Sequence, residues 1–271
     1  PSSPVSAWVT TTQRRPSHYG TAGRADRTSA GTSDERGARH EALVAPVETA
    51  VRGKIPVVII DSGLATNVYA SFVSTDNREG GRIAARNLGR LLGGKGNVIM
   101  LRLQVGSNST EEREAGFVEV MQQDFPSIRL LSIDQHAGAT RDTAKRAAET
   151  LLSRYGSVVN GVFAPNESTG AGMLLALRDA GLAGKVKFIA FDSGETLNAG
   201  LKSGHIDGLV VQNPMNMGYL GVKTAVAVLR GESPREYVHR NQGAVAGIGL
   251  YEGVFQSGGI AIKGLIAWFM H

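Results

Sequence analysis

Polar side chains follow several short apolar runs of this chain, at the point where each predicted strand ends. Asp61 and Asp192 each end such a run and each precede a serine and a glycine; Asn166 and Gln212 follow two further runs, and Arg113 opens a helix. Carboxylate, amide and guanidinium groups each make several planar hydrogen bonds, which suits adjacent hydroxyls that both donate and accept. Because open α/β sheets bind ligands outside the carboxyl ends of their strands, this set predicts a site for a polyhydroxylated ligand.

Each of these residues also has a purely structural interpretation. An Asp or Asn just past a strand is often a turn former or the N-cap of the next helix. Arg113 has glutamates beside it and could pair with them on a solvated helix face. For the pair at 76–77, also at a strand end, we expect the structural role. What favours binding is that such positions recur at equivalent places in two halves of the chain.

The elements that must position these side chains alternate between strand and helix. Ala144, Ala148 and Leu151 recur at helical spacing, for example, and the β-rich run 158–164 follows them. Strict alternation predicts an α/β fold whose parallel sheets are flanked by helices and joined by right-handed crossovers. The matching strand ends at Asp61 and Asp192 predict two lobes that face one ligand.

Composition narrows the function classes. The 271 residues include 29 Lys and Arg against 24 Asp and Glu, a net charge of +5, and the basic residues are scattered, so nucleic-acid binding is not implied. Without cysteine the chain has no thiolate nucleophile or zinc-thiolate site, and its histidines lack ligand spacing. The segment 89–96 partly fits a P-loop, but it follows a helix and precedes a strand, the reverse of the required order. We expect no enzymatic activity, no cofactor and no metal.

The two ends of the chain differ from the part between them. Residues 1–41 are rich in Ser, Thr, Ala, Gly and Arg, contain no lysine and sustain no apolar periodicity, so we expect a disordered or aberrant segment without a visible signal peptide. Residues 243–271 lose the alternation and close with an apolar run too short to span a bilayer. We expect an atypical tail there.

A series of segments carries a family resemblance. In chain order they are 54–61, 74–81, 113–117, 162–167, 189–192 and 210–214. Together they resemble the periplasmic sugar-binding proteins of the ribose-binding type, which are substrate-binding components of ABC importers with a two-lobed type I periplasmic binding fold. The resemblance covers about residues 42–242 and implies binding without chemistry.

The resemblance also implies a role for each site residue. Asp61 would accept sugar hydroxyls from the first lobe, and Arg113 would reach the ligand from the second. Asn166 and Asp192 would be the amide and carboxylate partners of Arg113, with Gln212 on the hinge side.

Two departures from the family pattern bear on the ligand. Ser62 stands where the ribose-binding branch often has arginine, and Ala139 stands where the family commonly has an aromatic ring. A smaller or differently shaped ligand than ribose is implied.

A further departure concerns the first lobe. The family begins with two strand-helix units ahead of the strand at 57–60, which at roughly thirty residues a unit needs about sixty ordered residues. We therefore expect an incomplete first lobe over 42–75 and 213–242, and a second lobe over 76–212 that folds on its own.

The implied partners are a small sugar and an ABC permease in the membrane, with no nucleic acid. We expect a periplasmic or extracytoplasmic monomer. The alternative is the ligand-binding domain of a lactose-repressor-type transcription regulator, which requires an N-terminal helix-turn-helix; no amphipathic helix pair occurs before residue 42.

Overall fold

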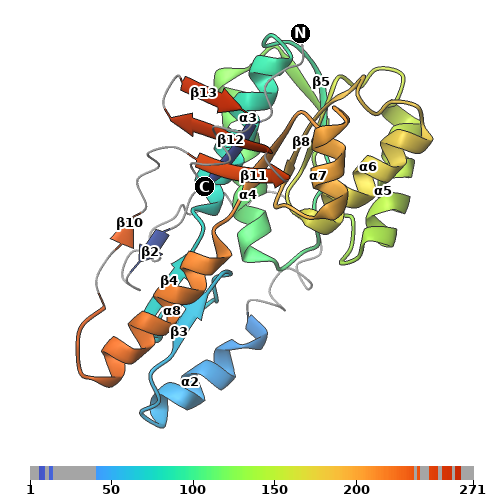
Figure 1. Ribbon diagram of the computed structural model, residues 1–271. Coiled ribbons are helices and arrows are strands. Elements are labelled where there is room, and N and C mark those ends of the chain that lie inside the picture. The colour runs from blue at the N-terminus through green and yellow to red at the C-terminus, as the bar shows by residue number, and fades with distance from the viewer. Residues whose placement is uncertain are drawn as a thin grey trace.

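Two lobes of unequal size and a separate three-stranded sheet make up the described part of the chain (Figure 1). The computed structural model describes residues 6–9, 12–14, 41–234, 237–238, 244–249, 252–257 and 260–263, with side chains over 41–234. The strands Ser6–Val9 and Thr12–Arg14 lie in different sheets, so one crossing joins them. The chain then passes from the smaller sheet to the larger between residues 74 and 77, and returns between 211 and 214. The lobe boundaries predicted at 75/76 and 212/213 fall in the latter two crossings and stay a prediction.

The larger lobe is built on a six-stranded sheet in which every neighbouring pair is parallel, as the alternation predicts. Its strand order is β1-β9-β8-β7-β5-β6. The strands are β1 (Ser6–Val9), β5 (Gly96–Met100), β6 (Ile128–Ser132), β7 (Gly161–Ala164), β8 (Lys187–Phe191) and β9 (Gly208–Val211). The helices are α3 (Asn77–Leu91), α4 (Asn108–Asp124), α5 (Arg141–Tyr155), α6 (Glu167–Asp179) and α7 (Glu195–Lys202).

Two apolar clusters fill the two faces of this sheet, because successive side chains of a strand point to opposite sides. On one face α3 and α4 pack over Phe163 and Phe191. The Phe117 ring of α4 stacks on Phe163 there, with centroids 4.3 Å apart. On the other face α5, α6 and α7 pack over Phe188 and Leu209. Both faces are therefore covered, as a parallel sheet requires.

The smaller lobe holds a four-stranded sheet in the order β10-β2-β4-β3. β3 (Val58–Ile60) and β4 (Ser71–Ser74) pair in parallel, whereas β2 (Thr12–Arg14) is antiparallel to β4 and to β10 (Tyr237–Val238). The expectation of wholly parallel sheets thus holds for the larger lobe, and in the smaller one only for the pair joined through the intervening segment 61–70. α8 (Pro214–Leu229) packs on β3 and β4, and α2 (Val44–Arg52) precedes them (Figure 1).

Both predicted atypical ends contain described strands. β1 and β2 come from residues 1–41, and β11 (Ala244–Gly249), β12 (Glu252–Ser257) and β13 (Ile260–Lys263) form an antiparallel sheet within 243–271. The rest of both segments lies outside the described residues, so the disordered or aberrant character of these ends stays a prediction.

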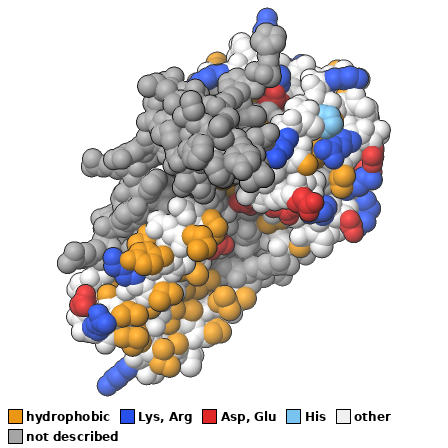
Figure 2. All heavy atoms as spheres, viewed as in Figure 1, with side chains coloured by type: hydrophobic (Ala, Val, Ile, Leu, Met, Phe, Trp, Pro, Cys, Tyr) orange, Lys and Arg blue, Asp and Glu red, His pale blue; other side chains and the backbone are white. Residues whose placement is uncertain are grey.

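An apolar surface covers part of the smaller lobe, where Figure 2 shows hydrophobic side chains gathered. On α8, Met215, Tyr219, Val222 and Leu229 are exposed, and Ile60 is exposed on β3. Among the helices described, none is both long and apolar enough to cross a membrane.

Candidate functional site

Asp61 and Asp192 share an unusual backbone conformation. Their φ angles are +73° and +70°, in the left-handed region that non-glycine residues rarely adopt. The amide of each still donates a ladder hydrogen bond, from Asp61 to the Val73 carbonyl at 2.9 Å and from Asp192 to the Val210 carbonyl at 2.7 Å. Each aspartate therefore continues its strand by one bond and then turns the chain. Such strain costs about 1–3 kcal/mol and is concentrated at functional sites, so its recurrence at both predicted positions favours a shared site.

The carboxylate of Asp192 is held by contacts from three directions. Oδ1 accepts a hydrogen bond from Gln212 Nε2 at 2.7 Å, and Oδ2 accepts one from the Glu167 amide at 3.2 Å. Arg113 Nη1 lies 3.7 Å from Oδ2. With 23% of its side chain exposed, Asp192 keeps part of its surface open to a ligand. The structure thus brings Arg113, Asp192 and Gln212 together; their role in ligand binding stays a prediction.

Arg113 is a buried cation fixed beneath this carboxylate. Only 2% of the residue is exposed, so the alternative of a solvated helix face is wrong. Its Nε donates to Asn77 Oδ1 at 2.9 Å and its Nη1 to the Pro165 carbonyl at 2.8 Å. The guanidinium carbon lies 3.8 Å from the centroid of the Phe191 ring, a cation–π contact.

Burial and charge act in opposite directions on Arg113. Burial lowers the pKa of its guanidinium, while the negative charges of Asp192, Asp61 and Glu114 oppose that change. Because Asp61 exerts this influence from the smaller lobe, the charges of both lobes act on one buried cation.

Asn166 and Asp61 are held less firmly. Asn166 is the N-cap of α6: its Oδ1 accepts from the Thr169 amide at 3.4 Å, and its Nδ2 donates to Ser168 Oγ at 3.0 Å. The structural interpretation is therefore realised for Asn166, one residue before the Glu167 amide that bonds Asp192. Asp61 is exposed.

The pair at 76–77 has two different roles. Asp76 caps α3, because its Oδ1 accepts from the Glu79 amide at 3.1 Å, as its structural interpretation predicts. Asn77 is a residue that the sequence reasoning missed, since it accepts the Arg113 hydrogen bond from 36 positions away. No local pattern signals a contact of that separation.

Close packing of α3 on α4 fixes the position of Asn77 relative to Arg113. A Cβ on Gly81 of α3 would lie 1.9 Å from the Arg113 carbonyl oxygen, and one on Gly116 of α4 would lie 2.0 Å from the Arg78 carbonyl oxygen. The two helices therefore meet backbone to backbone, which only glycine permits.

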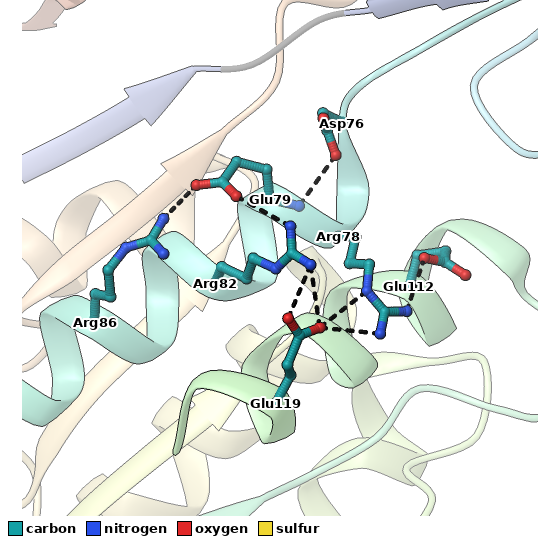
Figure 3. Close-up of polar contacts among 7 residues, drawn as sticks. All are labelled: Asp76, Arg78, Glu79, Arg82, Arg86, Glu112 and Glu119. Atoms are coloured by element: carbon teal, nitrogen blue, oxygen red, sulfur yellow. Dashed lines mark hydrogen bonds and ion pairs between the residues drawn. The ribbon is translucent and has the colours of Figure 1, made fainter. Parts of the chain in front are cut away.

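An ion network lies along the same helix pair (Figure 3). Glu119 of α4 accepts from Arg78 Nε at 3.1 Å and from Arg82 Nη2 at 2.9 Å, both on α3. Burial is the largest single influence and disfavours the charged carboxylate, but the hydrogen bonds and charges of the two arginines together outweigh it and lower the pKa of Glu119. Partly exposed pairs of this kind contribute little singly, and their value here is to fix the relative position of α3 and α4.

The two lobes also touch at the start of α4. The Gly63 amide donates to Asn108 Oδ1 at 3.2 Å, and the Ser109 amide donates to Ser62 Oγ at 3.3 Å. A hollow of about 330 Å³ lies beside this contact, lined by β3, by residues 61–64 and by Gly106. Ser62, at the position where the ribose-binding branch often has arginine, therefore makes a contact between the lobes.

Comparison with known proteins gives a consistent set of matches. A family model described as "Periplasmic binding protein domain" matches residues 37–233. The ribose import binding protein of Haemophilus influenzae is 32% identical over 192 residues, which are 71% of this chain and 64% of that protein. A xylitol-binding protein of Mycolicibacterium smegmatis is 32% identical over 193 residues, 71% of this chain and 54% of that protein. The chain thus spans less than two thirds of the length of these relatives.

Solved structures match in the same way. The periplasmic component of an ABC-type sugar transport system from Hahella chejuensis is 36% identical, with a TM-score of 0.68, and the match covers 75% of each chain. A carbohydrate transporter solute-binding protein from Agrobacterium radiobacter, in complex with D-arabinose, is 34% identical with a TM-score of 0.67; the match covers 74% of this chain and 71% of that one.

Proposed function

The chain belongs to the family of periplasmic binding protein domains, and on that premise we propose that it binds a small sugar or similar polyol between its two lobes. The ligand would then be delivered to an ABC-type importer in the membrane. The observation that carries this proposal is the Asp192 carboxylate, held by Gln212 and the Glu167 amide above the buried cation Arg113.

This arrangement suits vicinal hydroxyls. A carboxylate whose orientation is already fixed accepts two hydroxyl hydrogen bonds without losing further side-chain freedom, so the entropic cost of binding falls. The positive charge of Arg113 lies 3.7 Å from this carboxylate, and the exposed Asp61 offers a second acceptor from the other lobe. The relatives reported above are named for ribose and xylitol, and one solved structure holds D-arabinose. Two further similar structures hold alpha-D-tagatopyranose and D-fucose, so pentoses and hexoses are both candidates.

The proposal is binding without catalysis, by a monomer outside the cytoplasmic membrane. The relatives reported above are binding or transport proteins, which favours the importer over the regulator alternative. Lobe closure around the ligand would produce the form that the permease reads.

A thermal-shift screen of pentoses, hexoses and polyols tests the proposal. A ligand at a hundred times its dissociation constant stabilises the folded state by about 2.7 kcal/mol, which for a domain of this size raises Tm by roughly 5–10 °C. Asp192→Asn should remove the shift because it replaces the acceptor that faces the ligand. As a matched control, Thr169→Val in α6 should keep it, since the Thr169 hydroxyl has no hydrogen-bond partner among the described residues. The sugar assignment fails if no sugar or polyol shifts Tm while an amino acid or a cation does.

A further inference from the structure

We propose that Thr75 is a positioning residue, which sets the orientation of Gln212 at Asp192 and thereby links the Asp192 carboxylate to the two chain crossings at 74–77 and 211–214. The inference rests on the proposed function, because it concerns how that same site is held.

Thr75 lies in the crossing at 74–77, and Gln212 lies in the crossing at 211–214. Thr75 directly follows Ser74, the last residue of β4, and Gln212 directly follows Val211, the last residue of β9. Thr75 Oγ1 donates to Gln212 Oε1 at 2.6 Å, although the two residues are 137 positions apart. Gln212 Nε2 in turn donates to Asp192 Oδ1 at 2.7 Å. One continuous chain of hydrogen bonds therefore joins the crossing at 74–77, the crossing at 211–214 and the Asp192 carboxylate.

The first hydrogen bond decides which end of the glutamine amide faces Asp192. The terminal torsion of glutamine is broad, so the amide has little preference of its own. A donor at Oε1 leaves the amide NH2 group toward the carboxylate, whereas the opposite orientation would set a carbonyl oxygen against a carboxylate oxygen. Thr75 is the donor that selects the favourable orientation.

The surroundings of Thr75 make this bond hard to replace. Thr75 is 2% exposed, and its hydroxyl also lies 3.7 Å from Met217 Sδ, on α8 of the smaller lobe. Water therefore has little access to the hydroxyl, and a buried polar group that loses its partner costs more than the average hydrogen bond contributes. Gln212 is only half-buried, so a freed amide could turn toward solvent.

A rotation of the lobes acts on this chain of bonds directly. The φ and ψ changes of lobe closure occur in the short crossing segments, and these are the segments that carry Thr75 and Gln212. Closure therefore changes the geometry between the two residues, and with it the placement of the amide at Asp192. By the same coupling, a ligand bound at Asp192 favours the lobe arrangement in which all three groups are joined.

Substitutions that differ only in the hydroxyl test the proposal. Thr75→Val keeps the branched shape and removes the donor, Thr75→Ser keeps the donor, and Thr169→Val removes a hydroxyl that has no partner among the described residues. Affinity is measured calorimetrically, with whichever sugar or polyol gives the largest thermal shift. We expect about five- to twentyfold weaker binding for Thr75→Val, the equivalent of one buried hydrogen bond. We expect binding within about twofold of wild type for the other two variants. The proposal is overturned if Thr75→Val binds as wild type does, or if Thr75→Ser binds as weakly as Thr75→Val.

A second measurement separates this inference from the proposed function. Amide hydrogen exchange of the ligand-free protein reports on the crossings at 74–77 and 211–214 without any sugar. Thr75→Val should speed exchange in both segments and Thr75→Ser in neither. If wild type binds no sugar, the proposed function fails and exchange alone decides the positioning role. Unchanged exchange in Thr75→Val would then overturn it.

Discussion

Gly81→Ala tests the backbone contact that positions Arg113. Alanine adds a single methyl group, and that methyl would lie 1.9 Å from the Arg113 carbonyl oxygen, whereas real Cβ contacts are essentially never closer than 3.0 Å. The two helices would have to separate by about the difference, 3.0 − 1.9 = 1.1 Å. The obstacle is backbone within a packed helix, so no flexible side chain can yield to it.

Two opposing effects decide whether Gly81→Ala raises or lowers the free energy of unfolding. Replacing glycine by alanine inside a helix favours folding by about 1 kcal/mol. Forcing extra volume into a packed contact costs about 1–3 kcal/mol, occasionally more, and this contact is at the severe end because it is backbone to backbone. Separation of α3 from α4 also loosens the packing of Ala84 and Ala85 against Phe117. We expect a net loss of about 2 kcal/mol in the free energy of unfolding.

Urea unfolding followed by circular dichroism measures this loss. The matched control is Gly218→Ala in α8, where, apart from the surrounding turns of its own helix, no atom of the described residues lies within 4 Å of the added methyl. That variant should gain up to about 1 kcal/mol from helix propensity alone. Because Gly81→Ala also displaces the backbone of Arg113, it should weaken ligand binding as well. If Gly81→Ala is stabilised as Gly218→Ala is, the close packing of α3 on α4 does not exist in solution.

Further substitutions test the buried charges and the contact between the lobes. Burial raises the pKa of Glu114 although Arg102 opposes it, so the folded protein holds this proton to higher pH than the unfolded chain does. The free energy of unfolding should therefore fall as pH rises from the ordinary carboxyl pKa to the raised one. Urea titrations across that pH range should show a smaller fall for Glu114→Gln than for wild type. An identical fall in both proteins would contradict the raised pKa of Glu114. Asp192→Ala should abolish sugar binding and lower the free energy of unfolding by about 2 kcal/mol. This loss is smaller than the ~3–5 kcal/mol of breaking a fully buried ion pair, because the Asp192 carboxylate is 23% exposed. Unchanged affinity in calorimetry would remove Asp192 from the site. Asn108→Ala removes the acceptor of the Gly63 amide, which lies in the other lobe. Small-angle scattering of the ligand-free variant should therefore give a larger radius of gyration than wild type. An unchanged radius would show that this contact does not hold the lobes together.

The sequence predicts the larger lobe well because its signals are local. Helical periodicity and short apolar runs depend on residues a few positions apart, and they place α5, β7 and β8 without knowledge of the rest of the chain. The smaller lobe is harder for the opposite reason. β2 joins β4 from about sixty positions upstream, and its own segment carries no periodicity that would reveal the pairing.

The environment of Arg113, like the pairing of β2, could not be predicted from local sequence signals. Its flanking glutamates are typical of a solvated helix face, yet the side chain is buried. Its partners are Asn77, the Pro165 carbonyl and the Phe191 ring, which the fold brings from distant elements. Sequence reasoning singled out Arg113 at the start of a helix, and the resemblance implied its role. Only the tertiary packing explains why a guanidinium is stable there.

The two aspartates differ in how firmly they are held, although their strained backbones match. Asp192 is oriented by Gln212 and by the Glu167 amide, whereas Asp61 is exposed and acts on Arg113 through its charge. A ligand that meets Asp192 first pays little ordering cost, because that acceptor is already in place. In the proposed closure Asp61 would move with the smaller lobe relative to this group, so its hydrogen bonds to the ligand would form only as the lobes close. The difference in affinity between open and closed forms would then come mainly from Asp61, while recognition of the hydroxyl pattern would come mainly from Asp192.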